Sequence, residues 1–211
     1  MSTSIVPHAS PGCRRRMKPP PFEYVVAESV EAAVVALAGG EAKILAGGQS
    51  LVPMLNFRLL RPAILVDINR VPGLAFIEES DDAIRVGALT RHHQLETSPV
   101  VARHFPVLAT AMTHVAHLAV RNRGTLGGSL SHADPAAELP MLALLLDATL
   151  IVASPTGRRM VAAKDFFLGA LSVDLEPNDI VAVSRDKAQS LINSIGRSLT
   201  NGIPSIFYRV P

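Results

Sequence analysis

Apolar residues at the start of the chain alternate between strand-like runs and helical spacing. Ser29 can cap a helix that ends at Gly39, and the following apolar runs at residues 43–46 and 63–68 are typical of buried strands. A short helical segment is predicted between them, over residues 52–59. The apolar positions that share one face of the first helix are Val30, Ala33, Val34 and Leu37. The pattern indicates a βαβ-like unit.

The pattern changes after Val71 to Gly73. Residues 74–88 predict a hairpin around an acidic turn at 80–82, and residues 149–163 predict a second hairpin that turns at 155–157. Between the hairpins, helical spacing extends over residues 99–120, and another helix is expected over 135–146 with Pro135 near its first turn. We therefore predict an α+β fold.

Four segments are predicted along the chain. Residues 1–16 form a disordered or spuriously included leader, residues 17–70 and 71–183 form two subdomains, and residues 184–211 form an atypical tail. Five apolar residues in the tail have helical spacing and allow a short amphipathic helix, while its Ser/Asn-rich composition equally fits a shifted reading frame, a truncation or a recombined end. These five residues are Ala188, Leu191, Ile192, Ile195 and Leu199.

Composition excludes several classes of protein. A formal net charge of +2 and an aromatic content of 4% indicate no nucleic-acid partner. The longest apolar run is flanked by Glu138 and interrupted by Asp147, so no transmembrane segment is predicted. Cys13 is the single cysteine, so these 211 residues contain no internal disulfide and no cysteine-ligated zinc or iron–sulphur site. A reducing, cytoplasmic location is expected.

Two glycine pairs are the candidate binding elements. Gly47–Gly48 follow a strand and precede Gln49 and Ser50, an arrangement that exposes backbone N–H groups to a phosphate, although a lone glycine pair is more often a plain turn. The segment from Thr125 to Ser129 has the same pattern of a glycine pair beside hydroxyl residues, and it is predicted to form a second glycine loop around Gly127–Gly128. Two such loops could grip one diphosphate, and we expect positive φ at Gly48 and Gly128.

Other polar residues allow two interpretations each. Glu138 could accept hydrogen bonds from sugar or ribityl hydroxyls, or could simply be favoured at a helix N-terminus. His114 and His117 are three apart on an expected helix, and His132 follows the second loop, but packing or pocket roles are favoured over a metal site. Arg121 and Arg123 could neutralise phosphate or lie on a solvated loop.

The segments "LAGGQSL" and "VRNRGTLGGSLSHADPAAELP" resemble the two flavin-binding loops of the medium, FAD-binding subunit of molybdenum hydroxylases, the group that contains aerobic carbon monoxide dehydrogenase and xanthine dehydrogenase. The similarity covers roughly residues 17–183. It implies two α/β subdomains of the type seen in vanillyl-alcohol oxidase and p-cresol methylhydroxylase, with FAD between them. The cofactor-binding residues that it implies are Ala46, Gly47, Gly48, Gln49, Ser50, Val115, Thr125, Leu126, Gly127, Gly128, Ser129 and Glu138.

The resemblance also implies a division of labour among subunits. A large subunit would hold the molybdenum cofactor, a small subunit would carry 2Fe-2S clusters, and this chain would pass their electrons from FAD to an external acceptor. No acid, base, nucleophile or metal ligand is nominated, because the chemistry belongs to the flavin. Two alternatives stay open: a truncated, inactive remnant with weak or no flavin binding, and an unrelated phosphate-binding or scaffold module.

Overall fold

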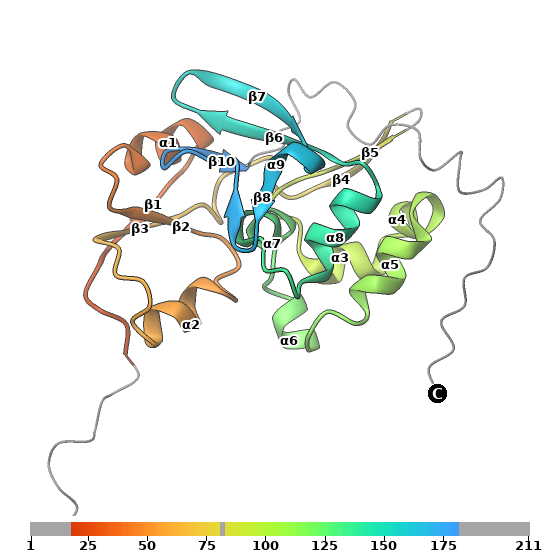
Figure 1. Ribbon diagram of the computed structural model, residues 1–211, viewed down its shortest axis with the longest axis horizontal. Coiled ribbons are helices and arrows are strands. Elements are labelled where there is room, and N and C mark those ends of the chain that lie inside the picture. The colour runs from red at the N-terminus through yellow and green to blue at the C-terminus, as the bar shows by residue number, and fades with distance from the viewer. Residues whose placement is uncertain (1–17, 81–82, 182–211) are drawn as a thin grey trace, which may run out of the picture.

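A parallel sheet organises the N-terminal part of the molecule. The computed structural model describes residues 18–80 and 83–181, so the expected leader and tail lie outside the described residues (Figure 1). The first five elements are β1 (Glu23–Val26), α1 (Val30–Leu37), β2 (Ala42–Leu45), α2 (Leu51–Asn56) and β3 (Ile64–Asp67). The strands pair in the order β1-β3-β2, all parallel, which confirms the βαβ-like start.

Local capping explains where the two helices of this part begin and end. The Ser29 side chain accepts a hydrogen bond from the Ala32 amide at 3.0 Å, which caps α1, and Gly40 leaves the helix with a φ of +75°. The predicted helix over residues 52–59 is shorter than expected, because Arg58 adopts a φ of +59° just beyond Asn56. A left-handed residue cannot continue a right-handed helix.

The next part contains one hairpin and a group of short helices. Its elements are β4 (Ile77–Ser80), β5 (Ala83–Val86), α3 (His92–Thr97), α4 (Pro99–His104), α5 (Pro106–Met112), α6 (Leu118–Arg121), α7 (Leu126–His132) and α8 (Glu138–Leu145). The helical spacing over residues 99–120 yields three helices, because Pro106 cannot continue the helix before it and Ala116 takes a φ of +44°.

Two expectations for this part are wrong. Gly127 and Gly128 lie inside α7 and do not form a loop, because the Thr125 side chain accepts from the Gly128 amide and starts the helix there. The helix expected from Pro135 begins only at Glu138, because Asp134 Oδ1 accepts from the Ala136 amide and holds the chain in a turn first.

The last part returns to antiparallel strands. Its elements are β6 (Thr149–Ser154), β7 (Gly157–Ala162), α9 (Ala163–Phe166), β8 (Phe167–Gly169), β9 (Ser172–Val173) and β10 (Ile180–Val181). The sheet order β10-β6-β7 confirms the predicted second hairpin. Figure 1 shows this hairpin beside α1, with the helices α3 to α8 on the other side of the molecule. The mixed helix and strand content confirms the α+β class.

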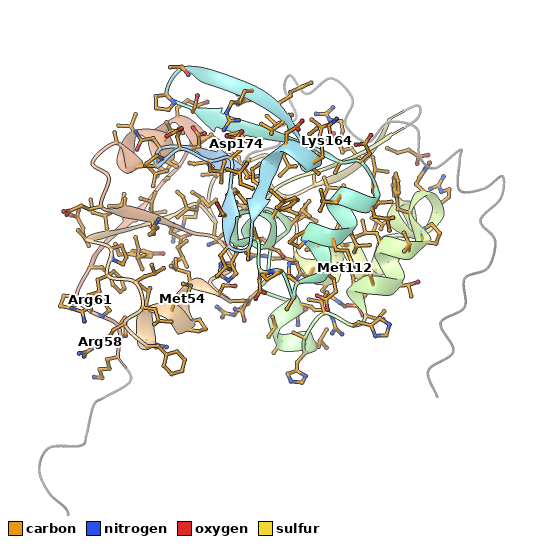
Figure 2. All side chains as sticks on the ribbon, in the orientation of Figure 1. Met54, Arg58, Arg61, Met112, Lys164 and Asp174 are labelled. Atoms are coloured by element: carbon orange, nitrogen blue, oxygen red, sulfur yellow. The ribbon has the colours of Figure 1, made fainter. Side chains whose placement is uncertain are left out.

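Two clusters of buried apolar side chains form the interior. The larger one lies among the helices and includes Met112, which is labelled in Figure 2, together with Leu142 and Phe166. The smaller one joins α1 and the parallel sheet to Ala153 of β6 and Ile180 of β10. The described strands from the two sides of residue 70 share no sheet, but their side chains share this cluster. The proposed subdomain boundaries stay a prediction.

Candidate functional site

A cleft lies between residues 46–50, the first glycine segment, and α7. Its volume is about 790 Å³, within the range of roughly 300–1,000 Å³ typical of cofactor pockets. The residues expected from sequence that line it are Ala46, Gly47, Gly48, Gln49, Ser50, Val115, Thr125, Gly127, Gly128, Ser129 and Glu138. Leu126 does not line it and faces a separate apolar cavity of about 90 Å³ among the helices. The fold therefore brings both glycine segments to one cavity.

The first glycine segment presents backbone donors without internal acceptors. Among the described residues, the amide N–H groups of Gly47, Gly48, Gln49 and Ser50 make no hydrogen bond. Gly48 has a φ of +70°, as expected, and the Gln49 side chain donates to the Gly47 carbonyl at 3.0 Å, which braces the turn. Four consecutive free donors at the wall of a cleft suit an anionic group such as a phosphate.

Gly47 is required by the close approach of the two segments. A Cβ at this position would lie 2.4 Å from the carbonyl oxygen of Arg123 and 3.0 Å from the Cα of Gly124. Both atoms belong to the backbone just before α7, so a side chain at residue 47 would push the two walls of the cleft apart. Absence of a side chain here sets the width of the cleft.

In the second glycine segment the amides of residues 126–129 are occupied, contrary to the expectation from sequence. The amides of Leu126 and Gly127 donate to Thr90 and Ala88 at 3.0 and 2.8 Å. Those of residues 128 and 129 donate to Thr125. Gly128 also lacks the expected positive φ, because a residue inside a right-handed helix has a negative φ. This wall offers bare glycine surface and the nearby hydroxyl of Ser129.

Residues that the sequence did not single out hold the second segment in place. Arg91 donates through Nη1 to the Arg123 carbonyl at 2.5 Å, and the His92 amide donates to the Gly124 carbonyl at 3.0 Å. The Nε2 of His92 lies 3.1 Å from the Thr125 carbonyl, which can only accept, so Nε2–H is the donor. Three consecutive carbonyls are thus fixed by two consecutive residues. Arg91 and Thr125 also form an isolated β-bridge in the structure. No feature of the sequence indicates this pairing.

Burial gives His92 unusual electrostatics. The residue is 6% exposed and lines the cleft, and its Nδ1 is buried without a hydrogen-bond partner among the described residues. Burial lowers the pKa of His92, an effect that the hydrogen bond to Thr125 and the charge of Glu138 oppose in part. The imidazole therefore stays neutral at neutral pH, with its proton on Nε2.

Of the remaining candidate residues, two line the cleft and two histidines lie outside the helix in which they were expected. Glu138 is half-buried at the start of α8 and lines the cleft, as does Val115. His114 and His117 lie in the connection between α5 and α6. The helix expected to carry them both is wrong, because Ala116 with its φ of +44° interrupts it.

In residues 18–80 and 83–181, no group of three or more His, Cys, Asp or Glu side chains could hold a metal ion. The helices in these same ranges are too short or too polar to span a bilayer.

Comparison with known proteins identifies relatives of this chain. Residues 20–183 match the family described as the FAD binding domain in molybdopterin dehydrogenase. The chain is 53% identical to the 6-hydroxypseudooxynicotine dehydrogenase complex subunit alpha of Paenarthrobacter nicotinovorans over 167 residues, which are 78% of this chain and 56% of that protein. It is 42% identical to the carbon monoxide dehydrogenase medium chain of Hydrogenophaga pseudoflava over 171 residues, covering 80% and 60% of the two chains.

A solved structure has the same fold. Quinoline 2-oxidoreductase from Pseudomonas putida 86 matches with a TM-score of 0.77 and 46% identity, over 78% of this chain and 58% of that one. The chain thus spans between half and two thirds of the length of these relatives. Its matched part includes both walls of the cleft.

Proposed function

Because the chain belongs to the family of FAD-binding domains of molybdopterin dehydrogenases, we propose that it holds FAD in the cleft between the first glycine segment and α7. The observation that carries this assignment is the row of free amides at residues 47–50 on the wall of a cavity of cofactor size. These donors would bind the pyrophosphate, which is the most strongly charged part of the cofactor.

The opposite wall would close on the same cofactor. Thr125 and the glycines of α7 leave room for a close approach, and the hydroxyl of Ser129 is a donor or acceptor at that wall. Glu138 would accept hydrogen bonds from ribityl or ribose hydroxyls, and Val115 would supply apolar contact. Leu126 would act indirectly, by packing the start of α7 against the larger apolar cluster.

The role of the chain in the whole enzyme follows from the cofactor. FAD supplies electron transfer when bound, while the protein fixes its position and surroundings. We propose that this chain is the electron-transfer subunit of a cytoplasmic molybdenum hydroxylase of the vanillyl-alcohol oxidase-like fold. Its partners would be a large subunit with the molybdenum cofactor and a small 2Fe-2S subunit, from whose clusters electrons would pass to an external acceptor. A four-cysteine cluster cannot be built with Cys13 alone, which supports a separate carrier.

The test is flavin binding by the purified 211-residue chain, with the released flavin identified by chromatography. We expect FAD at a one-to-one ratio and a large loss of affinity in Gly48→Ala. The matched control is Gly73→Ala, because Gly48 and Gly73 have φ values of +70° and +75°, but Gly73 does not line the cleft. Both changes carry a backbone cost of about 1–2 kcal/mol. A Cβ at residue 48 would also lie 3.2 Å from side-chain carbons of Leu45 and Val52, whereas one at residue 73 has nothing within 4 Å, so Gly48→Ala should cost somewhat more stability. FAD affinity is therefore compared where both variants are fully folded, and only Gly48→Ala should lose it.

The same titration decides between the open interpretations. A folded parent chain that binds no flavin would favour the inactive remnant and overturn the proposal. Binding of adenine nucleotides without flavin would indicate a phosphate-binding module instead. Equal FAD affinity in Gly48→Ala and Gly73→Ala would show that Gly48 is only a turn residue.

A further inference from the structure

One network of polar side chains connects the two walls of the cleft from outside it. Asn69 follows β3, and its Nδ2 donates to the Ala46 carbonyl at 2.9 Å, which belongs to the first glycine segment. Its Oδ1 accepts from Arg91 Nη2 at 2.7 Å, and Arg91 Nη1 donates to the Arg123 carbonyl, two residues before the second segment. Two side chains therefore span the distance from one segment to the other.

We propose that Asn69 and Arg91 form a positioning bridge that sets the spacing of the two glycine segments, and so controls FAD affinity without touching the cofactor. Neither residue lines the cleft. This inference rests on the proposed binding of FAD in that cleft. The bridge and Gly47 act on the same distance between the two segments. Gly47 lies against the Arg123 carbonyl, which is also the carbonyl that accepts from Arg91.

The ends of the bridge are anchored independently. Asp67 Oδ1 accepts from both the amide and the Nδ2 of Asn69, at 2.8 and 2.6 Å, which fixes the carboxamide so that its oxygen faces Arg91. Tyr24 donates to the other oxygen of Asp67. The amide of Arg91 donates to Gln94 Oε1 at 2.8 Å, which ties its backbone to the first turn of α3. A bridge with fixed ends transmits position, whereas a mobile pair would not.

The chemistry of the bridge requires these two residue types. A guanidinium presents separate N–H groups in a rigid plane, so Arg91 reaches a side-chain oxygen and a backbone carbonyl together, which a lysine ammonium cannot do in the same geometry. A carboxamide both donates and accepts, so Asn69 can hold Ala46 and receive Arg91 at once. Partial burial of Arg91 strengthens these contacts relative to a fully exposed pair.

The proposal predicts two linked effects of Arg91→Lys and Asn69→Ala. Amide hydrogen exchange of the free chain should become faster at Val52 and Met54, whose amides donate to the carbonyls of Gly48 and Ser50, and at the hydrogen-bonded amides of residues 126–129. Both groups of amides should respond to either substitution. FAD affinity should fall roughly tenfold or more, as for loss of a hydrogen bond to a charged group. The double variant should lose less than the product of the two single losses, because both substitutions break one bridge.

The control is Arg103→Ala, since Arg103 is an exposed arginine that pairs with Glu79 at 3.5 Å and does not line the cleft. It should change neither readout. Affinity is measured well below the melting temperature of each variant, so a merely structural role would lower stability and leave the affinity of the folded protein unchanged. Parental affinity with unchanged exchange at Val52 and Met54 in Arg91→Lys would overturn the bridge. If the parent binds no FAD, the proposed function fails while hydrogen exchange still decides the bridge.

Discussion

Substitution of Gly47 by alanine tests the contact between the walls of the cleft. The new Cβ would lie 2.4 Å from the Arg123 carbonyl oxygen, whereas ordinary contact begins at 3.4 Å, so the carbonyl has to retreat by about 1 Å. The nearest atoms all belong to backbone, so no side-chain rotation can relieve the clash. Such overpacking costs about 1–3 kcal/mol, which corresponds to a fall in Tm of roughly 2–12 °C for a chain of this size.

The assay combines thermal unfolding of the free chain with FAD titration. Gly39→Ala is the matched control, because a Cβ there has nothing within 4 Å and Gly39 does not line the cleft. We expect Gly39→Ala to keep the parental Tm within about 1–2 °C. We expect Gly47→Ala to lose both stability and FAD affinity. Parental Tm and affinity in Gly47→Ala would refute the argument that these two backbones touch.

Two further predictions concern buried polar groups. Burial lowers the pKa of His92 below its ordinary 6.5, so the unfolded chain binds the proton more readily. Stability should therefore fall as pH drops below about 6.5, by at most about 1.4 kcal/mol per pH unit, and His92→Gln should flatten this slope in denaturant titrations between about pH 7 and pH 5. Arg159→Met should cost about 1–3 kcal/mol in urea unfolding, because it removes the partner of Asp179, whose side chain is 3% exposed. Arg158→Met should cost less than about 1 kcal/mol, since Arg158 pairs with the exposed Glu31, and equal costs would contradict the role of burial.

Local signals in the sequence predicted the elements that depend on local chemistry. The cap at Ser29, the two hairpins and the parallel start are confirmed, because capping and strand periodicity are encoded within a few residues. The family, which is described as an FAD binding domain, is also confirmed, since the motifs that carry the resemblance lie in the matched region. The helix limits near Arg58 and Ala116 were missed, because positive φ in a non-glycine residue comes from tertiary packing.

The site was predicted less completely. Glycine pairs indicated the two walls, but the sequence did not reveal that Thr125 caps a helix and accepts from the amides of residues 128 and 129, or that Thr90 and Ala88 accept from those of residues 126 and 127. Asn69, Arg91 and His92 were missed because their contacts join residues more than twenty positions apart. Such contacts leave no periodicity or spacing in a single sequence.

The smaller apolar cluster, shared by α1, the parallel sheet, β6 and β10, has a consequence for how the protein moves. A hinge between the N-terminal sheet and the rest would have to expose Ala153 and Ile180, which are 3% and 4% exposed. The two parts should therefore melt as one cooperative unit, and a fragment cut near residue 70 should aggregate. A ligand would then enter and leave the cleft through small movements of its rim, with slow exchange as the result.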